Sequence, residues 1–329
     1  MRSFYLLFFV AVSAGAVAVR AQDTFTLRVD VSLVTLDVQV SDAAGRPVTT
    51  LKREDFEIYE NGKLQELASF SPVDSPYSVL VLFDCSGSTQ QNWPFLVQSM
   101  NRFTARLRPQ DRIAVAQFGG SFKMLMDWLS RGAKIDVQIQ TNDSSCSSTD
   151  FYGAINRALS EVRPAVGRKG VVVLTDGGHN RIPYQRFRPN DTGLRRYVDT
   201  EDDGDFQKIL RAVRASDVVF YFVAVNTDLN PDRTSSARGY NPMNIYNMQQ
   251  VRARMELLAE DSGGRLAFPR DPQDVIPLFE QIGQELGTSY GLGYAPANSK
   301  KDGTYRKIEV RVRDKTLQVR QSRAGYEER

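Results

Sequence analysis

Residues 79–89 have the sequence VLVLFDCSGST, in which five apolar side chains are followed at once by a carboxylate and several hydroxyls. A short, uninterrupted apolar run of this kind is typical of a buried strand in a parallel sheet. Asp84, Ser86 and Ser88 then form a D-x-S-x-S pattern where that strand ends. Because ligands of open α/β sheets bind outside the carboxyl ends of the strands, we expect this loop to belong to a site.

The chain on both sides of this loop alternates short apolar runs with longer segments of helical apolar spacing. This alternation begins at Ser78 and predicts a mostly parallel sheet with helices on both faces. The expected strands are residues 79–83, 113–118, 171–174, 218–225 and 266–268. The expected helices are residues 95–107, 152–162, 206–215, 249–262 and 275–286.

The segments that flank this α/β region have the two-residue alternation of half-buried strands. It covers residues 25–40, with a change of phase at Val34 that predicts a bulge or a crossing between sheets. Asn61-Gly62 predicts a tight hairpin, and the prolines at 72 and 76 predict a linker. The alternation returns after Thr288. Since neither segment has enough strands to bury a face alone, we expect both to pair into one β-sandwich that carries the α/β domain as an insertion.

The first residues have the features of a secretory signal. Arg2 precedes an apolar stretch from Phe4 to Ala18, which is short for a membrane span, and small residues follow it. We therefore predict export to the periplasm or the cell exterior, and no transmembrane span in the mature chain. The predicted parts are a signal peptide (1–21), the N-terminal part of the sandwich (22–74), the α/β domain (75–287) and the C-terminal part of the sandwich (288–329).

Two further loops give weight to the D-x-S-x-S pattern, which alone is often only a self-bonded turn. Thr149 lies just before a predicted helix, and Asp176 follows the next predicted strand. With these loops the region from Ser78 to Leu286 resembles the von Willebrand factor A family, whose metal-ion-dependent adhesion site takes a D-x-S-x-S, a Thr and an Asp in that order. The flanking strands resemble a subgroup of that family, the von Willebrand factor A related domains frequent in Acidobacteria.

This resemblance implies a Rossmann-like α/β fold and a divalent cation. The residues carried over as its ligands are Asp84, Ser86, Ser88, Thr149 and Asp176. Hydroxyl and carboxylate oxygens select hard cations, so we predict Mg²⁺, with Mn²⁺ or Ca²⁺ as alternatives. Neutral hydroxyls leave positive charge on the ion, and an Asp or Glu carboxylate of a partner protein would complete its shell. The alternative interpretation is that the loops preserve the fold and that the ion is absent or only structural.

Cys85 and Cys146 are the only cysteines, and both lie in loops that this fold would bring together. In an oxidising compartment two such cysteines are usually paired, and a disulfide would preorganise the site. The alternative is two small buried thiols.

The segment after Asp176 combines arginines with aromatic residues and predicts a rim that selects acidic partners, although such a run is usually a solvated loop. The residues of this predicted rim are His179, Arg181, Arg186, Arg188, Arg195 and Arg196. Acidic residues between Asp199 and Asp205 resemble the opening of an EF-hand, but Leu210 stands where the bidentate Glu belongs. We interpret them as a polar loop and a helix start.

Composition and motifs argue against other classes. Loss of Arg2 and Arg20 with the signal would lower the formal charge from +3 to +1, too little for a general nucleic-acid binder. The sequence has no nucleophile elbow, no P-loop and no zinc-protease motif, so we predict a non-enzymatic protein-binding or adhesion module. The alternatives are a scaffold subunit of an envelope complex and a metal-dependent hydrolase, with Asp150 or His179 as its base.

Overall fold

The computed structural model describes residues 34–329, apart from 74, 131–134, 136, 138–143, 181, 186–195, 226–241, 299, 301 and 328–329. The chain consists of two compact units, Met1–Val31 and Ser32–Arg329, and every described residue belongs to the second. The predicted signal peptide and the predicted strands before residue 34 lie outside the described residues. Within the described part of the chain, no helix is long and apolar enough to cross a membrane.

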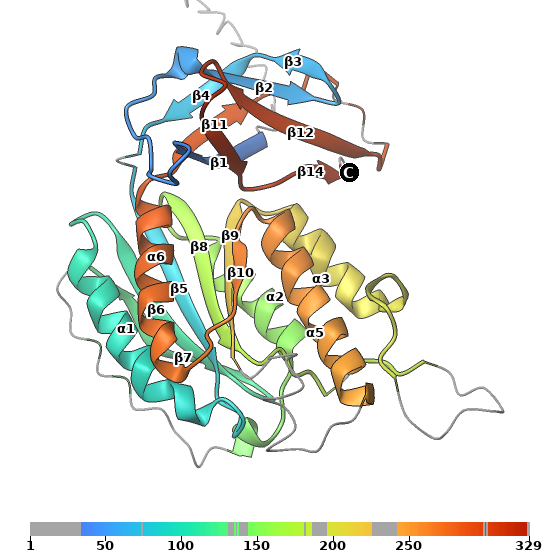
Figure 1. The fold of residues 1–329 in the computed structure, drawn as a ribbon. Coiled ribbons are helices and arrows are strands. Elements are labelled where there is room, and N and C mark those ends of the chain that lie inside the picture. The colour runs from blue at the N-terminus through green and yellow to red at the C-terminus, as the bar shows by residue number, and fades with distance from the viewer. Residues whose placement is uncertain are drawn as a thin grey trace, which may run out of the picture. The chain divides into compact units, whose positions relative to one another are not determined.

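A six-stranded sheet forms the centre of the α/β domain (Figure 1), with the strand order β10-β9-β8-β5-β6-β7. Its strands are β5 (Tyr77–Asp84), β6 (Arg112–Phe118), β7 (Phe122–Leu129), β8 (Arg168–Thr175), β9 (Val218–Ala224) and β10 (Arg265–Ala267). Neighbouring strands are parallel except β7, which pairs antiparallel with β6. The five predicted strands are confirmed. The edge strand β7 was not predicted, because its half-buried residues lack a clear alternation.

Helices cover both faces of this sheet, as predicted. Those on one face are α1 (Trp93–Arg106) and α6 (Val275–Gly287); those on the other are α2 (Phe151–Val162), α3 (Gly204–Arg214) and α5 (Pro242–Asp261). Helix α5 begins seven residues before the predicted start at Gln249. Helices α1 and α6 pack so closely that a Cβ at Gly283 would lie 2.7 Å from the Phe103 ring. Short 3₁₀ helices occupy Arg53–Asp55, Gln90–Asn92, Ser144–Ser147, Thr200–Asp202 and Pro272–Asp274.

The flanking segments form two four-stranded sheets with the orders β13-β1-β11-β4 and β14-β12-β2-β3. Strands from the N-terminal segment are β1 (Val34–Ser41), β2 (Phe56–Glu60), β3 (Lys63–Gln65) and β4 (Leu67–Ser71). Those from the C-terminal segment are β11 (Tyr290–Tyr294), β12 (Tyr305–Val312), β13 (Gln318–Gln321) and β14 (Gly325–Glu327). Each sheet mixes both segments, since β1 pairs with β11 and β2 pairs with β12. The predicted sandwich with an inserted α/β domain is thus confirmed.

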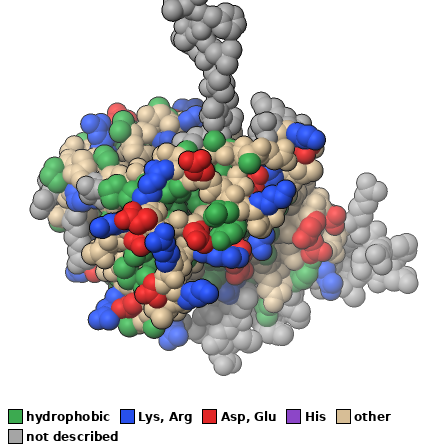
Figure 2. All heavy atoms as spheres, turned by 90° about the horizontal axis from the view of Figure 1, so that it is seen from above, with side chains coloured by type: hydrophobic (Ala, Val, Ile, Leu, Met, Phe, Trp, Pro, Cys, Tyr) green, Lys and Arg blue, Asp and Glu red, His purple; other side chains and the backbone are tan. Residues whose placement is uncertain are grey.

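Local geometry in the sandwich follows the sequence pattern. Side chains of β1 alternate between buried and half-buried, and its apolar residues join one core with those of β11 and β12. Asn61 and Gly62 have φ angles of 48° and 77°, the two positive values that the predicted hairpin between β2 and β3 requires. On the sandwich face that Figure 2 shows, basic and acidic side chains are interspersed with apolar ones.

The sandwich meets the α/β domain at the amino end of the central sheet. Arg168, at the start of β8, donates to the backbone oxygens of Val73, Ser75 and Ser289, in the two chain segments that join the parts. Gln39 of β1 donates to the Tyr221 hydroxyl at 3.1 Å. Strands β5, β6, β8 and β9 therefore run away from the sandwich, and their carboxyl ends lie at the opposite edge of the sheet (Figure 1).

Candidate metal centre

The loop after β5 turns around the carboxylate of Asp84, whose exposed fraction is 0%. Asp84 Oδ1 accepts a hydrogen bond from the Ser86 N–H at 2.9 Å, and Oδ2 accepts from Thr175 Oγ1 at 2.9 Å. The Asp84 carbonyl accepts from Thr89 Oγ1 at 2.7 Å and from the Trp93 indole at 3.2 Å. These bonds fix both the start and the end of the D-x-S-x-S loop.

Two serine hydroxyls connect this loop to the loop after β8. Ser86 Oγ lies 3.1 Å from Ser88 Oγ, and Ser88 Oγ donates to Asp176 Oδ2 at 2.5 Å. Because β5 and β8 are parallel neighbours, their ends place Asp84 and Asp176 at the same edge of the sheet. Side-chain oxygens of Ser86, Ser88 and Asp176 are therefore linked, and the Asp84 carboxylate joins them through the Ser86 N–H, so four of the five predicted ligands lie together.

Thr149 approaches the same edge from the segment before α2. Its carbonyl accepts from the Asn180 N–H at 3.1 Å, and its N–H donates to Asn180 Oδ1 at 3.4 Å. The next residue, Asp150, donates its N–H to Gly119 O at 2.7 Å and caps α2 by accepting from the Gly153 N–H. The structure thus holds the Thr149 backbone against the residues that follow Asp176.

A disulfide joins Cys85 to Cys146, with Cα atoms 5.2 Å apart. Cys85 lies between Asp84 and Ser86, and Cys146 lies three residues before Thr149. The predicted bridge is confirmed, and it ties two of the three loops together. Both half-cystines are buried, with exposed fractions of 2% and 8%.

Comparison with protein families agrees with this arrangement of three loops on a parallel sheet. Residues 79–179 match the model of the von Willebrand factor type A domain. The chain contains a von Willebrand factor A domain. The matched residues run from β5 through the D-x-S-x-S and Thr149 loops to the Asp176 loop. A search of curated proteins gave no match.

Solved structures with a similar fold share few identical residues with this chain. The conserved hypothetical protein BatB from Bacteroides thetaiotaomicron is 16% identical over 64% of this chain and 97% of its own, with a TM-score of 0.43. The pilus adhesin SpaC from Lactobacillus rhamnosus GG is 7% identical over 88% of this chain and 48% of its own, with a TM-score of 0.42. Sequence identities and TM-scores this low do not allow the partner or activity of these proteins to be assigned to this chain.

The electrostatics of the loops in this von Willebrand factor A domain favour a bound cation. Burial raises the pKa of Asp84 to about 6, the nearby Asp176 carboxylate adds to the rise, and hydrogen bonds from Ser86 and Thr175 oppose it. Among the described residues, neither Asp84 nor Asp176 forms an ion pair with a basic side chain. A divalent cation would supply the missing positive charge.

The donor set fits a hard cation. It consists of carboxylate and hydroxyl oxygens, the ligands that Mg²⁺, Mn²⁺ and Ca²⁺ prefer. Within the described ranges no group of three or more His, Cys, Asp or Glu side chains gathers to hold a metal, so the soft or imidazole-rich site that zinc prefers is not found there. An adhesion-type site does not need such a group, because serine and threonine supply most of its oxygens.

A hollow of about 350 Å³ lies beside Asp150, between the edge strand β7 and helix α2. Phe122 and Met124 contribute apolar surface to it, while Arg157 and Glu161 form an ion pair along its wall at 2.7 Å. The hollow therefore combines apolar and charged surface next to the Thr149 loop.

The predicted arginine rim falls mostly outside the described residues, which exclude Arg181, Arg186, Arg188 and Arg195. Arg196 is described, and its guanidinium lies 5.5 Å from the centre of the Tyr246 ring. The prediction for His179 needs correction: it is 5% exposed and packs against the Tyr152 ring, so it faces the interior and not a partner.

The acidic segment that resembles an EF-hand is a helix start, as interpreted. Asp203 is the N-cap of α3 and accepts from the Phe206 N–H at 3.0 Å. Asp203 also binds two buried residues, Tyr152 and Arg254, and these contacts were not predicted. A signal was present, because Arg254 lies on the apolar stripe of α5 between Val251 and Leu258. A charged residue on such a stripe indicates a buried partner.

Proposed function

We propose that this chain is an exported, non-enzymatic binding module that captures partner proteins through a divalent cation. The oxygen cluster from Asp84 through Ser86 and Ser88 to Asp176 supports this proposal most strongly. The proposed ligands, acting directly or through water, are Asp84, Ser86, Ser88, Thr149 and Asp176. A partner's Asp or Glu carboxylate completes the shell of the ion.

Charge explains why such a site binds a partner reversibly. Three of the five proposed ligands are neutral hydroxyls, and an ion that meets Asp84 and Asp176 through water retains positive charge at the carboxyl ends of the strands. An external carboxylate gains most from that charge, because it adds the anionic oxygen that the hydroxyl ligands do not supply. The hollow beside Asp150 offers space for side chains that flank this carboxylate.

Export is supported by two observations. The apolar stretch before residue 21 has the features of a cleaved signal, and the disulfide between Cys85 and Cys146 needs an oxidising compartment to persist. A mass measurement of the chain recovered from its native compartment would test cleavage after residue 21. A chain that retains Arg2 and Arg20 would contradict it.

Two finer assignments belong to the same proposal. Mg²⁺ is the proposed ion, with Mn²⁺ and Ca²⁺ as alternatives of the same oxygen preference. The proposed subgroup is that of the von Willebrand factor A related domains frequent in Acidobacteria, on the resemblance of the flanking strands. That affiliation concerns architecture and adds no mechanism.

Calorimetric titration of the mature chain with Mg²⁺, Mn²⁺ and Ca²⁺ after chelation tests the proposal. The wild type should bind one ion, and Asp84→Ala and Ser86→Ala should lose that binding. Ser147→Ala is a matched control, because its hydroxyl bonds only to the carbonyl of Ser144 within its own turn. Equal binding by the wild type and Asp84→Ala would contradict the proposal.

Partner capture distinguishes this function from its alternatives. Binding of an acidic partner that disappears with EDTA supports a metal-dependent module. A scaffold would bind its neighbours with or without chelator, and a hydrolase would turn over a substrate when the ion is restored.

A further inference from the structure

Two buried charged residues lie behind the metal loops, and the proposed site does not use them. Asp203 and Arg254 are each 1% exposed, and Arg254 Nη2 donates to Asp203 Oδ2 at 3.0 Å. Arg254 also donates to the carbonyls of Val198 and Gln250. This pair therefore joins the start of α3 to the middle of α5.

Tyr152 connects the pair to the first turn of α2. Its hydroxyl donates to Asp203 Oδ2 at 2.7 Å and accepts from Arg254 Nε at 2.8 Å. Its ring packs against the imidazole of His179, with centroids 4.1 Å apart. Tyr152 is thus fixed at its hydroxyl end and supports His179 with its ring.

His179 in turn touches the backbone on both sides of Asp150. Its Nδ1 accepts a hydrogen bond from the Phe151 N–H at 3.2 Å and lies 3.3 Å from the Thr149 carbonyl oxygen. The same carbonyl accepts from the Asn180 N–H. Contacts therefore run without a break from Arg254 to the backbone of Thr149.

We propose that Tyr152, Asp203 and Arg254 are positioning residues of the metal centre. They hold His179, and through it the Thr149 backbone, in the geometry in which the Thr149 hydroxyl reaches the ion. This inference rests on the proposed function, and none of the three residues touches the ion. Groups that orient metal ligands from behind commonly change metal affinity by 10-fold to 100-fold when they are removed.

Stability alone is a weak reason for such a cluster, because buried ion pairs are often replaceable by apolar residues without loss. The sandwich provides a cluster of the same chemistry far from the metal loops. There Tyr294 donates its hydroxyl to Glu60 Oε2 at 2.7 Å, and Glu60 pairs with the buried Arg306 at 3.7 Å. Tyr294→Phe is therefore a matched control for Tyr152→Phe.

The first test is titration of both variants and the wild type with Mn²⁺ and Mg²⁺, beside their unfolding in urea. We expect Tyr152→Phe to bind the ion about tenfold more weakly than the wild type, and Tyr294→Phe to keep wild-type affinity. Asp203→Asn should weaken affinity in the same direction. Wild-type affinity in Tyr152→Phe, with a stability loss equal to that of Tyr294→Phe, would overturn the inference.

Amide hydrogen exchange of the metal-free chain gives a readout that does not depend on the ion. The N–H groups of Phe151 and Asn180 report on the contacts that hold Thr149. They should exchange faster in Tyr152→Phe and unchanged in Tyr294→Phe. Unchanged exchange in Tyr152→Phe overturns the positioning role. A wild type that binds no ion would instead refute the proposed function, and exchange would then decide the positioning role by itself.

Discussion

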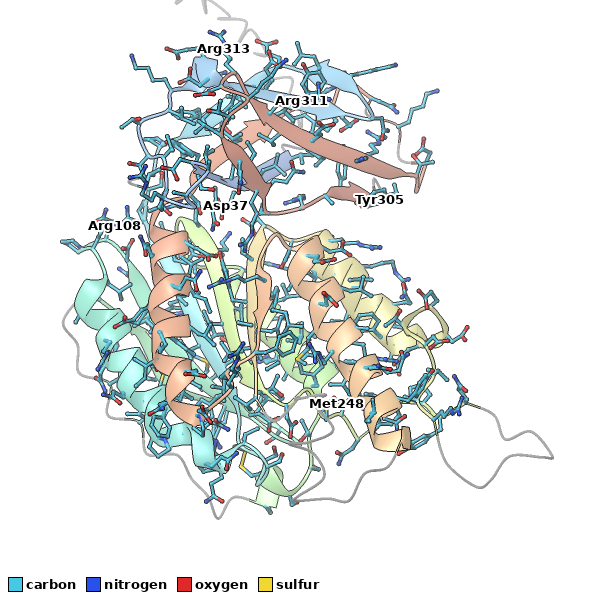
Figure 3. All side chains as sticks on the ribbon, viewed as in Figure 1. Asp37, Arg108, Met248, Tyr305, Arg311 and Arg313 are labelled. Carbon is cyan, nitrogen blue, oxygen red and sulfur yellow. A yellow bond between two sulfur atoms is a disulfide. The ribbon has the colours of Figure 1, made fainter. Side chains whose placement is uncertain are left out.

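The two edges of the central sheet are built from opposite chemistry. At the amino end, buried arginines bind the carbonyls that connect the domain to the sandwich, as Arg168 does with Val73, Ser75 and Ser289. Arg108, labelled in Figure 3, donates to two of the same carbonyls and pairs with Asp111 at 2.9 Å. At the carboxyl end, the carboxylates of Asp84 and Asp176 accept hydrogen bonds from hydroxyls and backbone N–H groups.

This difference indicates that the amino end of the central sheet has a structural role and that the carboxyl end has a functional one. Arg168 and Arg108 find carbonyl acceptors within the chain at the amino end, where they hold the junction with the sandwich. The carboxylates of Asp84 and Asp176 at the carboxyl end form no ion pair with a basic side chain among the described residues, and a cation would balance their charge. Variants at the amino end should therefore change stability and leave ion affinity unchanged, whereas variants of the metal loops should change ion affinity whether or not they also change stability.

The largest effect on stability is expected from the disulfide. Replacing Cys85 and Cys146 by serine opens a loop of 61 residues, and the chain-entropy model gives a loss of about 4 kcal/mol in the free energy of unfolding. Urea unfolding of the double variant measures it. Ion affinity should also fall, because the bridge joins two metal loops. A loss below about 1 kcal/mol would show that the bridge constrains the chain little.

Arg168→Ala should destabilise the chain by about 3 kcal/mol, because it leaves the Ser289 carbonyl without its charged donor and removes one of the two arginine donors from the carbonyls of Val73 and Ser75. Ion affinity should stay at the wild-type value, since the metal loops lie at the other edge. Arg112→Ala, at the exposed start of β6, is the control and should be nearly neutral. Weakened ion binding in Arg168→Ala would contradict the separation of the two edges.

Asp37 at the junction, labelled in Figure 3, should make stability depend on pH. Burial raises its pKa to about 7 from an ordinary 3.8, against the attraction of Arg168. Because the folded state holds this proton more tightly, the stabilising contribution is full below pH 3.8 and is lost as pH rises through 7. Asp37→Asn should therefore gain up to about 4 kcal/mol over the wild type at pH 8 and little at pH 4, because each unit of raised pKa is worth about 1.4 kcal/mol. Urea unfolding of both proteins at pH 4 and pH 8 measures this gain. An equal difference in the free energy of unfolding at the two pH values would show that the proton on Asp37 is not its cause.

The smallest effect is expected from the ion pair beside the metal loops. Arg157 is 60% exposed and pairs with Glu161 one helical turn away, so Arg157→Ala should cost less than about 0.5 kcal/mol and leave ion affinity unchanged. A change in ion affinity would show that this pair belongs to the site. Thermal unfolding measures the stability of Arg157→Ala, and metal titration of the same preparation measures its ion affinity.

Sequence patterns predicted most of this fold because its strands are short, buried and separated by clear breaks. The run from Val79 to Phe83 and the Asn61-Gly62 turn are local signals that the structure follows. Strand β7 was missed because an edge strand is only half-buried and its side chains do not alternate cleanly. The early start of α5 at Pro242 was missed because the Asn-Pro dipeptide at this point is typical of a turn.

The site was predictable where its residues follow a spacing, and hidden where only tertiary packing brings them together. Asp84, Ser86 and Ser88 share one loop, and the Cys85 bridge followed from the fold. His179 was predicted at the rim because the sequence gives its place along the chain and not the direction of its side chain. In the structure its ring packs inward onto Tyr152. Nothing in local spacing connects Asp203 to a tyrosine 51 residues earlier.

The most direct test of the central claim is the relaxation rate of water protons in the presence of Mn²⁺ and the mature chain. A bound ion with an open position should raise this rate, and acetate should then lower it by replacing water on the ion, whereas acetamide should not. Asp84→Ala should show no rise. An equal rise in Asp84→Ala, or a rise in the wild type that acetate leaves unchanged, would contradict a metal centre that a carboxylate completes.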